Sequence, residues 1–224
     1  MLPGGLECGI ISRQGHKGKI LNVLQSCQAV PVSGIIRIGE VRSVIIVTKR
    51  LLIRDLKTED ADSFVQMASD GSLNDIGFDK DCGEWMAEWI EEAKEFALRD
   101  DPNSDYLAYG IDLKSDGRII GSIGCSYYED LQETGITYFI EEQHRKKGYA
   151  AEAVKAYAEF FLRRYKASRL IATVREENTA SWKTVEKAGF KLTAKRAYKD
   201  LNDKEAQMYR FYEIRSSAFE TFTG

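Results

Sequence analysis

The chain has 224 residues, of which 43% are apolar and 30% are charged. This length and apolar content exclude a disordered protein, and they fit one folded domain with an appendage better than two full domains. The formal net charge of -3 is too small to indicate a nucleic-acid or membrane partner through the field of the whole protein.

The charge is unevenly distributed along the chain. Residues 1–50 carry seven basic and two acidic side chains, a net charge of +5, whereas the other 174 residues carry 25 basic and 33 acidic side chains, a net charge of -8. We therefore expect a basic N-terminal extension at 1–47, poorly ordered or a short helix, a main domain at 48–215 and a tail at 216–224. Three explanations of the extension stay open: a genuine appendage, a basic arm that binds a partner, or a start codon assigned too early, with initiation near Val47.

The cysteine spacing and the lengths of the apolar segments indicate in which cellular compartment the protein is expected. Cys8, Cys27, Cys82 and Cys125 lie far apart, without the paired spacing of a zinc site or of a dense disulfide framework. No stretch reaches the roughly 18 apolar residues of a membrane helix, and the first 30 residues lack the apolar region of a signal peptide. We expect a cytoplasmic protein with no metal, no nucleic-acid partner and no membrane partner.

Strands and a helix are predicted first. β-branched runs indicate strands at 35–36, 44–47 and 51–53. Thr58, which is followed by acidic residues, is expected to cap a helix whose apolar face includes Phe64.

A second helix is predicted over 83–98, and its Trp85 and Trp89 are assigned to core packing. Strand-like runs follow at 106–113, 119–127 and 135–140. Because Asp116-Gly117 is a strong hairpin signal between the first two runs, we expect the three strands to form a meander.

A third helix is predicted after this meander. Its core positions, spaced four, three and four residues apart, are Ala150, Val154, Tyr157 and Phe161, and it is expected to end near residues 163–165. The short strand that follows at 170–174 implies a parallel, right-handed crossover, because a helix separates it from the preceding strand.

The last elements complete the predicted fold. Asn178 is expected to cap a fourth helix that Gly189 stops, and two strands follow at 190–194 and 208–214. The predicted class is α/β (α+β): a mixed, mostly antiparallel twisted sheet with helices on both faces and a central strand-helix-strand parallel crossover.

The segment Arg145–Ala150, RKKGYA, lies between a predicted strand and the first turn of a helix. A helix N-terminus binds phosphates because it presents free backbone N–H groups and a partial positive charge. Gly148 lets the backbone approach an anion, and Arg145, Lys146 and Lys147 add positive charge. The glycine spacing matches neither a Walker loop nor a dinucleotide fingerprint, and a solvated basic loop stays open as the alternative.

Asn178 and Ser181 stand three residues apart at the start of the fourth predicted helix. Residues with this spacing share a helix face, so a ligand at the end of the helix could meet both side chains. An ordinary helix cap would account for the same two residues.

Together these segments resemble the GNAT N-acetyltransferase superfamily. Its signature Arg/Gln-x-x-Gly-x-Gly/Ala is matched by residues 145–150, followed by Glu152-Ala153, and its later Asn-x-x-Ser pattern by Asn178 and Ser181, with Gly189-Phe190 behind. Residues 50–61 are similar to the first strand and helix of the subgroup that acetylates the N-terminal alanine of ribosomal proteins. The resemblance spans roughly residues 48–215.

The resemblance implies an enzyme that transfers an acetyl group from acetyl-CoA to a primary amine by direct attack, with a protein or peptide α-amino group favoured. It also implies that the pantetheine arm pairs with one strand, that the pyrophosphate lies on the following loop, and that Ser181 donates a proton to the departing thiolate. The implied cofactor-binding residues are Tyr138, Phe139, Ile140, Arg145, Lys146, Lys147, Gly148, Tyr149, Ala150 and Asn178.

One position departs from the family pattern. Many relatives have a glutamate three residues before the tyrosine of the cofactor strand, and here that position is Gly135. Glu133, on the same strand face, is the candidate catalytic base, with a solvated loop acid as the alternative. His144 is expected to face solvent or adenine phosphates, and Tyr198 and Tyr209 to line the acceptor pocket or to pack in the core.

Two other functions stay open at this point. One is acetylation of a small amine such as an antibiotic or a polyamine, and the other is a non-catalytic regulatory module that binds acyl-CoA. The expected partners are acetyl-CoA and an amine acceptor, and a homodimer is a further expectation.

Overall fold

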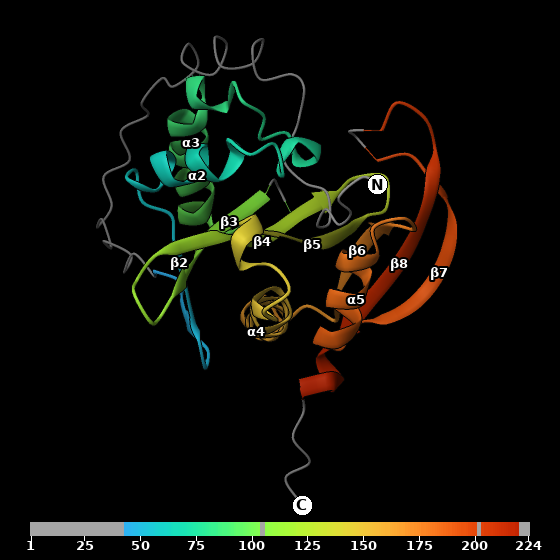
Figure 1. Ribbon diagram of the computed structural model, residues 1–224. Helices are drawn as coiled ribbons and strands as arrows, with labels where there is room; N and C mark the ends of the chain where they lie inside the picture. Colours follow the sequence, from blue (N-terminus) through green and yellow to red (C-terminus); the bar gives the residue numbers. More distant parts are fainter. Residues whose placement is uncertain (1–42, 104–105, 201–202, 220–224) are drawn as a thin grey trace, which may run out of the picture.

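A computed structural model describes residues 43–103, 106–200 and 203–219, and its strands form one eight-stranded sheet (Figure 1). The spatial order is β1-β2-β3-β4-β5-β6-β8-β7. The strands are β1 (Ile45–Val47), β2 (Leu51–Asp55), β3 (Tyr106–Leu113), β4 (Ile119–Tyr128), β5 (Glu133–Ile140), β6 (Arg169–Arg175), β7 (Lys191–Tyr198) and β8 (Gln207–Arg215). All neighbouring pairs are antiparallel except β5 and β6, which are parallel. The predicted mixed, mostly antiparallel sheet with one parallel crossover is confirmed.

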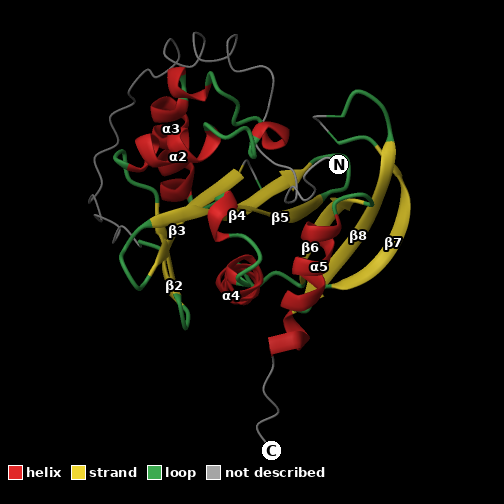
Figure 2. Cartoon of the chain, in the orientation of Figure 1, coloured by secondary structure: helices red, strands yellow, loops and turns green. Residues whose placement is uncertain are grey.

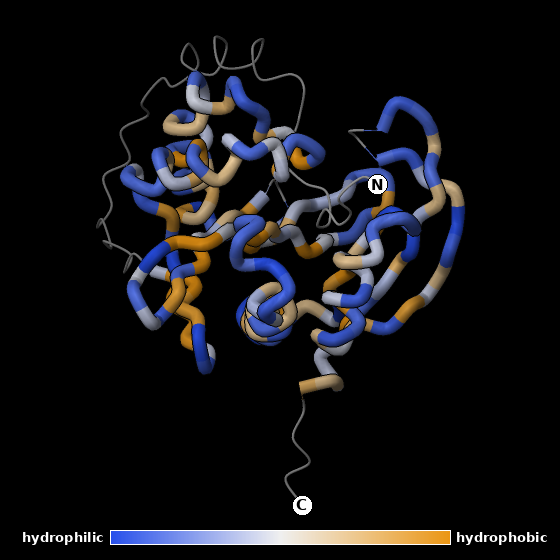
Figure 3. Tube along the Cα trace, viewed as in Figure 1, coloured by the Kyte–Doolittle hydropathy of each residue, from blue (hydrophilic) through white to orange (hydrophobic). Residues whose placement is uncertain are grey.

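Helices cover both faces of the sheet, as Figures 1 and 2 show, with α2 and α3 on one face and α4 and α5 on the other. The α-helices are α2 (Asp60–Ala68), α3 (Met86–Arg99), α4 (Tyr149–Arg164) and α5 (Thr179–Ala188), and the short 3-10 helices are η1 (Asn74–Ile76), η2 (Cys82–Glu84), η3 (Glu142–His144) and η4 (Ser216–Phe219). The more hydrophobic stretches follow the strands, whereas the turns that join elements are mostly hydrophilic (Figure 3). The central strands β3, β4, β5 and β6 are therefore buried from both sides, whereas the edge strands β1 and β7 are mostly exposed.

Strand β5 shows how the sheet separates two cores. Because successive side chains of a strand point to opposite faces, Ile136, Tyr138 and Ile140 pack in the cluster that contains α4, and Phe139 packs in the cluster that contains α2 and α3. Phe139 contacts Phe64 of α2 edge to face, with ring centroids 5.6 Å apart. Even-numbered and odd-numbered residues of β5 thus serve different sides of the molecule.

The starts of the first two described helices differ from the sequence prediction. The N-cap of α2 is Glu59, and the Thr58 hydroxyl donates to Glu91 of α3 instead of capping the helix. The helix predicted from residue 83 begins at Met86, because η2 occupies residues 82–84. Trp89 lies in the core as predicted, with its ring edge to face against Phe78.

The N-terminal part of the sheet includes residues ahead of the domain boundary predicted at 48. Strand β1 pairs with β2 in the register Ile46↔Ile53, and Val44 is buried in the core. The predictions for residues 1–42, including the strand at 35–36, lie outside the described residues. Within the part of the chain that the structure describes, no helix is long and apolar enough to cross a membrane.

Candidate active site

The site begins where the two parallel strands part. Over the described residues β5 and β6 pair at one position, Gly135↔Ile171. Beyond it β5 continues beside β4 to Ile140, and β6 continues beside β8 to Arg175. The residues predicted to pair with a cofactor arm, Tyr138, Phe139 and Ile140, lie on β5 beyond this point. We call the space between the diverging strands the β5–β6 opening.

The loop that follows β5 leads directly into the N-terminus of α4. Gly148 is the N-cap, with φ of 79°, and Lys146 also has a positive φ of 60°. The first helical bond in this turn runs from the Glu152 N–H to the Gly148 carbonyl, 3.2 Å. The N–H groups of the first turn have no earlier carbonyl within the helix, so they face the end of the loop, where an anion would be stabilised.

The Arg145 side chain has partners within the protein, and its predicted role in meeting a phosphate stays a prediction. Its Nε donates to the Ile140 carbonyl at 2.9 Å, and its Nη2 donates to the Ser72 carbonyl at 3.2 Å. The guanidinium therefore ties the loop to the end of β5 and to the segment after α2.

Two cations that the sequence reasoning did not assign to the site lie beside Gly148. A Cβ placed on Gly148 would be 3.5 Å from Nη2 of Arg50 and 3.8 Å from Nζ of Lys187. Arg50 also stacks on the Tyr149 ring, with 4.5 Å from Cζ to the ring centroid, and its Nη1 donates to the Lys147 carbonyl at 2.9 Å. Arg50 lies in the segment 50–61 that resembles the start of the GNAT domain, so the sequence could have pointed to it. Nothing in the local sequence marks Lys187 as a site residue.

Glu152 joins the β1–β2 hairpin to the first turn of α4. Its carboxylate accepts from the Thr48 hydroxyl at 2.7 Å, from the Arg50 backbone N–H at 2.8 Å and from Arg50 Nε at 2.7 Å. Burial opposes the charged form, but these hydrogen bonds outweigh it and lower the pKa of Glu152 from its ordinary value of 4.5. The hairpin therefore holds Arg50 against the start of α4.

Residues from β5 and α5 meet on the α4/α5 face of the sheet. The Asn178 side chain caps α5 by accepting from the Ser181 N–H at 3.0 Å, as predicted. Ser181 is fully buried, and its Oγ lies 3.0 Å from the Tyr138 hydroxyl. The sequence singled out Ser181 and placed Tyr138 on the cofactor strand, and the fold brings the two hydroxyls into contact.

The other face of β5 is closed at Gly135. A Cβ placed there would lie 2.5 Å from Cε2 of Tyr128, so the aromatic ring fills the space where a longer side chain would begin. Glu133, the candidate base, lies at the start of β5, two residues before Gly135 and away from the opening. It forms an ion pair with Arg169. Arg169 also contacts Glu213 at 3.3 Å. Glu133 is therefore committed to an ion-pair network at the start of β5.

His144 differs from the expectation that it would face solvent. It is buried, with Nδ1 2.8 Å from Glu141 and Nε2 3.1 Å from Nη2 of Arg118. Tyr209 is also buried, and its hydroxyl donates to Asp203 at 2.7 Å, while the Tyr198 ring packs edge to face on it at 5.3 Å. Burial raises the pKa of both tyrosines. These contacts fit packing roles.

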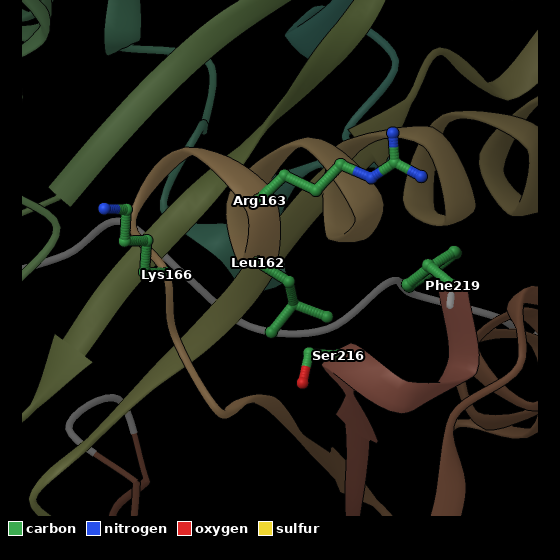
Figure 4. A pocket seen from close by; sticks show the side chains of 5 residues that line it. All are labelled: Leu162, Arg163, Lys166, Ser216 and Phe219. Carbon is green, nitrogen blue, oxygen red and sulfur yellow. The ribbon is translucent and has the colours of Figure 1, made fainter. Parts of the chain in front are cut away.

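A shallow apolar recess lies at the far end of α4 from Gly148. Its lining residues are Leu162, Arg163, Lys166, Ser216 and Phe219. Figure 4 shows the charged ends of Arg163 and Lys166 pointing away from Leu162. No convergent polar groups gather there among the described residues, and we assign the recess no role in the site.

Comparison with known proteins agrees with this geometry. The family described as acetyltransferase (GNAT) domain matches residues 50–191. YjdG, an uncharacterized N-acetyltransferase of Bacillus subtilis (strain 168), is 29% identical over 133 residues, which cover 56% of this chain and 77% of YjdG.

Solved structures show the same fold. A GNAT-family acetyltransferase from Bacillus anthracis has a TM-score of 0.65 at 20% identity, over 78% of this chain and 99% of that chain. RimL, a ribosomal L7/L12 α-N-protein acetyltransferase solved with coenzyme A, has a TM-score of 0.62 at 16% identity, over 78% of this chain and 99% of RimL.

Proposed function

Because this chain belongs to the GNAT acetyltransferase family, an N-acetyltransferase family whose donor is acetyl-CoA, we propose that it acetylates the α-amino group of a protein or peptide. The activity follows from the family, and the choice of acceptor and the roles of individual residues are the proposal. RimL, which shares the fold, acts on a protein α-amino group, and this supports the choice.

The start of α4 has the features that CoA phosphates require. The positive φ of Gly148 and the absence of its side chain let a phosphate approach the first-turn N–H groups. Arg50 and Lys187 add positive charge there, since their nitrogens lie within 4 Å of the place that a Gly148 Cβ would occupy. Lys146 and Lys147, both exposed, extend the positive surface. When bound, acetyl-CoA supplies the acetyl thioester. Tyr138, Phe139 and Ile140 then line the path of the pantetheine arm along the β5–β6 opening.

Ser181 is the proposed proton donor. Its hydroxyl is buried where β5 and α5 meet, and the Tyr138 hydroxyl 3.0 Å away orients it. A sulfur leaving group with an ordinary thiol pKa of about 8.5 leaves more readily when a proton is held beside it. The same Asn178 cap that begins α5 fixes the backbone of Ser181.

The observation that carries the choice of acceptor is the closure of Gly135 by Tyr128. No carboxylate can extend from this position, and Glu133 is held by Arg169. An α-amino group, with a pKa of about 7.7–8.0, is partly neutral at pH 7, whereas a lysine or polyamine amine, near 10.4, needs a stronger base. A site without a carboxylate at residue 135 therefore favours α-amino groups.

The test is an acceptor panel with acetyl-CoA as donor, measured as CoA release. The panel contains a lysine-free peptide with a free N-terminus, the same peptide blocked at the N-terminus and given one lysine, spermidine, and an aminoglycoside. We expect kcat/KM for the free N-terminus to exceed the others by about tenfold or more, in line with the difference in neutral amine. A preference for spermidine or the aminoglycoside would overturn the choice of acceptor. Tight CoA binding with no turnover on any amine would instead indicate a non-catalytic module.

A further inference from the structure

The space next to Gly135 is filled by one aromatic side chain from the neighbouring strand. A Cβ at Gly135 would lie 2.5 Å from Cε2 of Tyr128, closer than normal packing allows, and 3.1 Å from Cδ2, a tight contact. Tyr128 ends β4 and is 8% exposed, so its ring is held in the core and cannot swing away as a flexible side chain would. Gly135 and Tyr128 thus form a fitted pair.

This pair lies at the mouth of the β5–β6 opening, on the α2/α3 face. Gly135 is the position at which β5 pairs with β6, through Ile171. Thr173, two residues further along β6 on the same strand face, donates from Oγ1 to the Tyr128 hydroxyl at 3.4 Å. The Tyr128 side chain therefore crosses β5 and contacts Thr173 of β6. On this face of the sheet, Thr173 is the first β6 residue after the Gly135↔Ile171 pair.

The hydroxyls of Tyr128 and Tyr138 lie on opposite faces of the sheet. Tyr138 and Ser181 meet on the α4/α5 face, where the leaving sulfur would need a proton. Attack on the thioester carbonyl needs an amine that comes from a different direction from the departing sulfur. The α2/α3 face lies opposite the Tyr138–Ser181 contact and offers such a direction.

We propose that Tyr128 is the acceptor-positioning residue: the Tyr128 ring over Gly135 and its hydroxyl beside Thr173 bind the primary amine at the mouth of the β5–β6 opening. This role rests on the proposed N-acetyltransferase activity. The phenol oxygen accepts a hydrogen bond from the amine, and the phenol O–H can pass a proton onward to solvent, which a neutral tyrosine does without becoming a strong base.

The protons balance as follows. An ammonium acceptor loses one proton through the Tyr128 hydroxyl to solvent and becomes a neutral amine. The amine nitrogen forms a bond to the acetyl carbon and the carbon–sulfur bond breaks. The sulfur receives a proton from Ser181, and the second proton that leaves the nitrogen replaces it on the Ser181 hydroxyl. The products are the N-acetyl amine, the CoA thiol and one solvent proton.

Three neighbouring side chains on this face have other partners. Glu133 is paired with Arg169, Arg175 is paired with the buried Asp203, and Phe139 is apolar and packs against α2. Tyr128 and Thr173 are two hydroxyl-bearing residues that the fold brings into contact at the mouth of the opening on this side.

The test compares Tyr128→Phe with Tyr127→Phe. The control is the adjacent residue of the same strand, so it removes the same hydroxyl from the opposite face. We expect Tyr128→Phe to lower kcat/KM for the peptide amine by about 100-fold, the lower end of a proton-transfer contribution. The dissociation constant of acetyl-CoA should change by less than twofold. Calorimetry with CoA present should show peptide binding weakened in Tyr128→Phe.

A double variant separates positioning from packing. In Tyr128→Ala/Gly135→Glu the ring no longer blocks residue 135, and a carboxylate enters the vacated space. We expect activity above that of Tyr128→Ala alone, together with a new ionisation on the acid side of the kcat/KM profile, in the range where an ordinary glutamate titrates.

The outcomes distinguish the two proposals. If Tyr128→Phe matches Tyr127→Phe in kcat/KM and in peptide binding, Tyr128 only packs against Gly135 and the role is overturned, while the proposed function stands. If the unsubstituted protein binds acetyl-CoA but acetylates no peptide amine, the proposed function fails and this role falls with it.

Discussion

The two sides of the β5–β6 opening are built in different ways. The proposed cofactor side comes from short continuous segments: the loop 145–150 runs into α4, and Asn178 and Ser181 lie at the start of α5. Its proposed ligand groups are largely backbone N–H groups of a helix start. The proposed acceptor side is assembled from residues of three strands, Tyr128 on β4, Gly135 on β5 and Thr173 on β6.

This difference separates what binds the donor from what selects the acceptor. A helix N-terminus binds phosphate wherever the turn leaves room, so the cofactor side depends on one glycine and its surrounding charges. The acceptor side depends on which side chain fills a given space, and a single exchange of glycine and tyrosine can change it. We therefore expect substitutions on the cofactor side to change the affinity for CoA, and substitutions at the reacting groups to change turnover.

The largest expected effect comes from Gly148→Glu. A side chain at φ of 79° is strained, and the added carboxylate would repel phosphates at the start of α4. We expect CoA affinity to fall by about 100-fold, roughly 2.7 kcal/mol, measured by calorimetry. Gly117→Glu is the matched control, since Gly117 has φ of 73° and no atom of the described residues lies within 4 Å of an added Cβ. Equal CoA affinity in the two variants would refute the phosphate site.

Ser181→Ala tests the proton donor. With no hydroxyl beside the departing sulfur, we expect kcat to fall by about 10- to 100-fold while CoA affinity stays within about twofold. Ser122→Ala removes another buried hydroxyl, which donates to the Tyr109 carbonyl at 2.9 Å within the sheet, and should leave kcat unchanged once folding is verified. A matching loss of kcat in both variants would show that Ser181 acts through stability.

Lys187→Ala tests the charge that only the fold brings to the cofactor side. We expect a loss of CoA affinity of about three- to tenfold at low salt, which becomes smaller as the ionic strength rises, because Lys187 is exposed. Lys155→Ala, an exposed lysine in the middle of α4, provides the comparison. Titrations at 50 mM and 500 mM salt check this, and an effect independent of salt would contradict a direct charge role.

The smallest expected effect concerns the tie between the hairpin and α4. The pKa of Glu152 is lowered in the folded protein, so its stabilisation is present above pH 4.5 and disappears as the pH falls through the folded value. We expect Glu152→Gln to reduce the free energy of unfolding at pH 7 by about 1 kcal/mol, with allowance for solvent screening, and the difference to narrow at acid pH.

Urea unfolding at several pH values measures this difference. Glu159→Gln, which removes an exposed i,i+4 pair with Arg163 on the same helix, should change stability by less than about 0.5 kcal/mol at every pH. A pH-independent cost of Glu152→Gln would rule out the ionised carboxylate as the cause.

Much of the fold could be predicted from local patterns. The Asp116-Gly117 turn, the apolar spacing of α4, and the Asn178 and Gly189 ends of α5 all depend on residues close in sequence, and each lies where it was predicted. The predicted N-cap of α2, Thr58, was wrong by one residue. The Thr58 hydroxyl donates to Glu91 on α3, a contact that the local sequence does not reveal.

For the site, the sequence by itself determined the elements of the donor side: a glycine-containing loop before α4, and an Asn and Ser pair at the start of α5. These are local features whose chemistry depends on backbone position and adjacent residues. Only the tertiary structure decided that Arg145 ties its own loop down, that Arg50 and Lys187 supply charge beside Gly148, and that Tyr128 fills the space over Gly135. The physical reason is that side-chain contacts across strands depend on sheet register and strand order, which no short segment encodes.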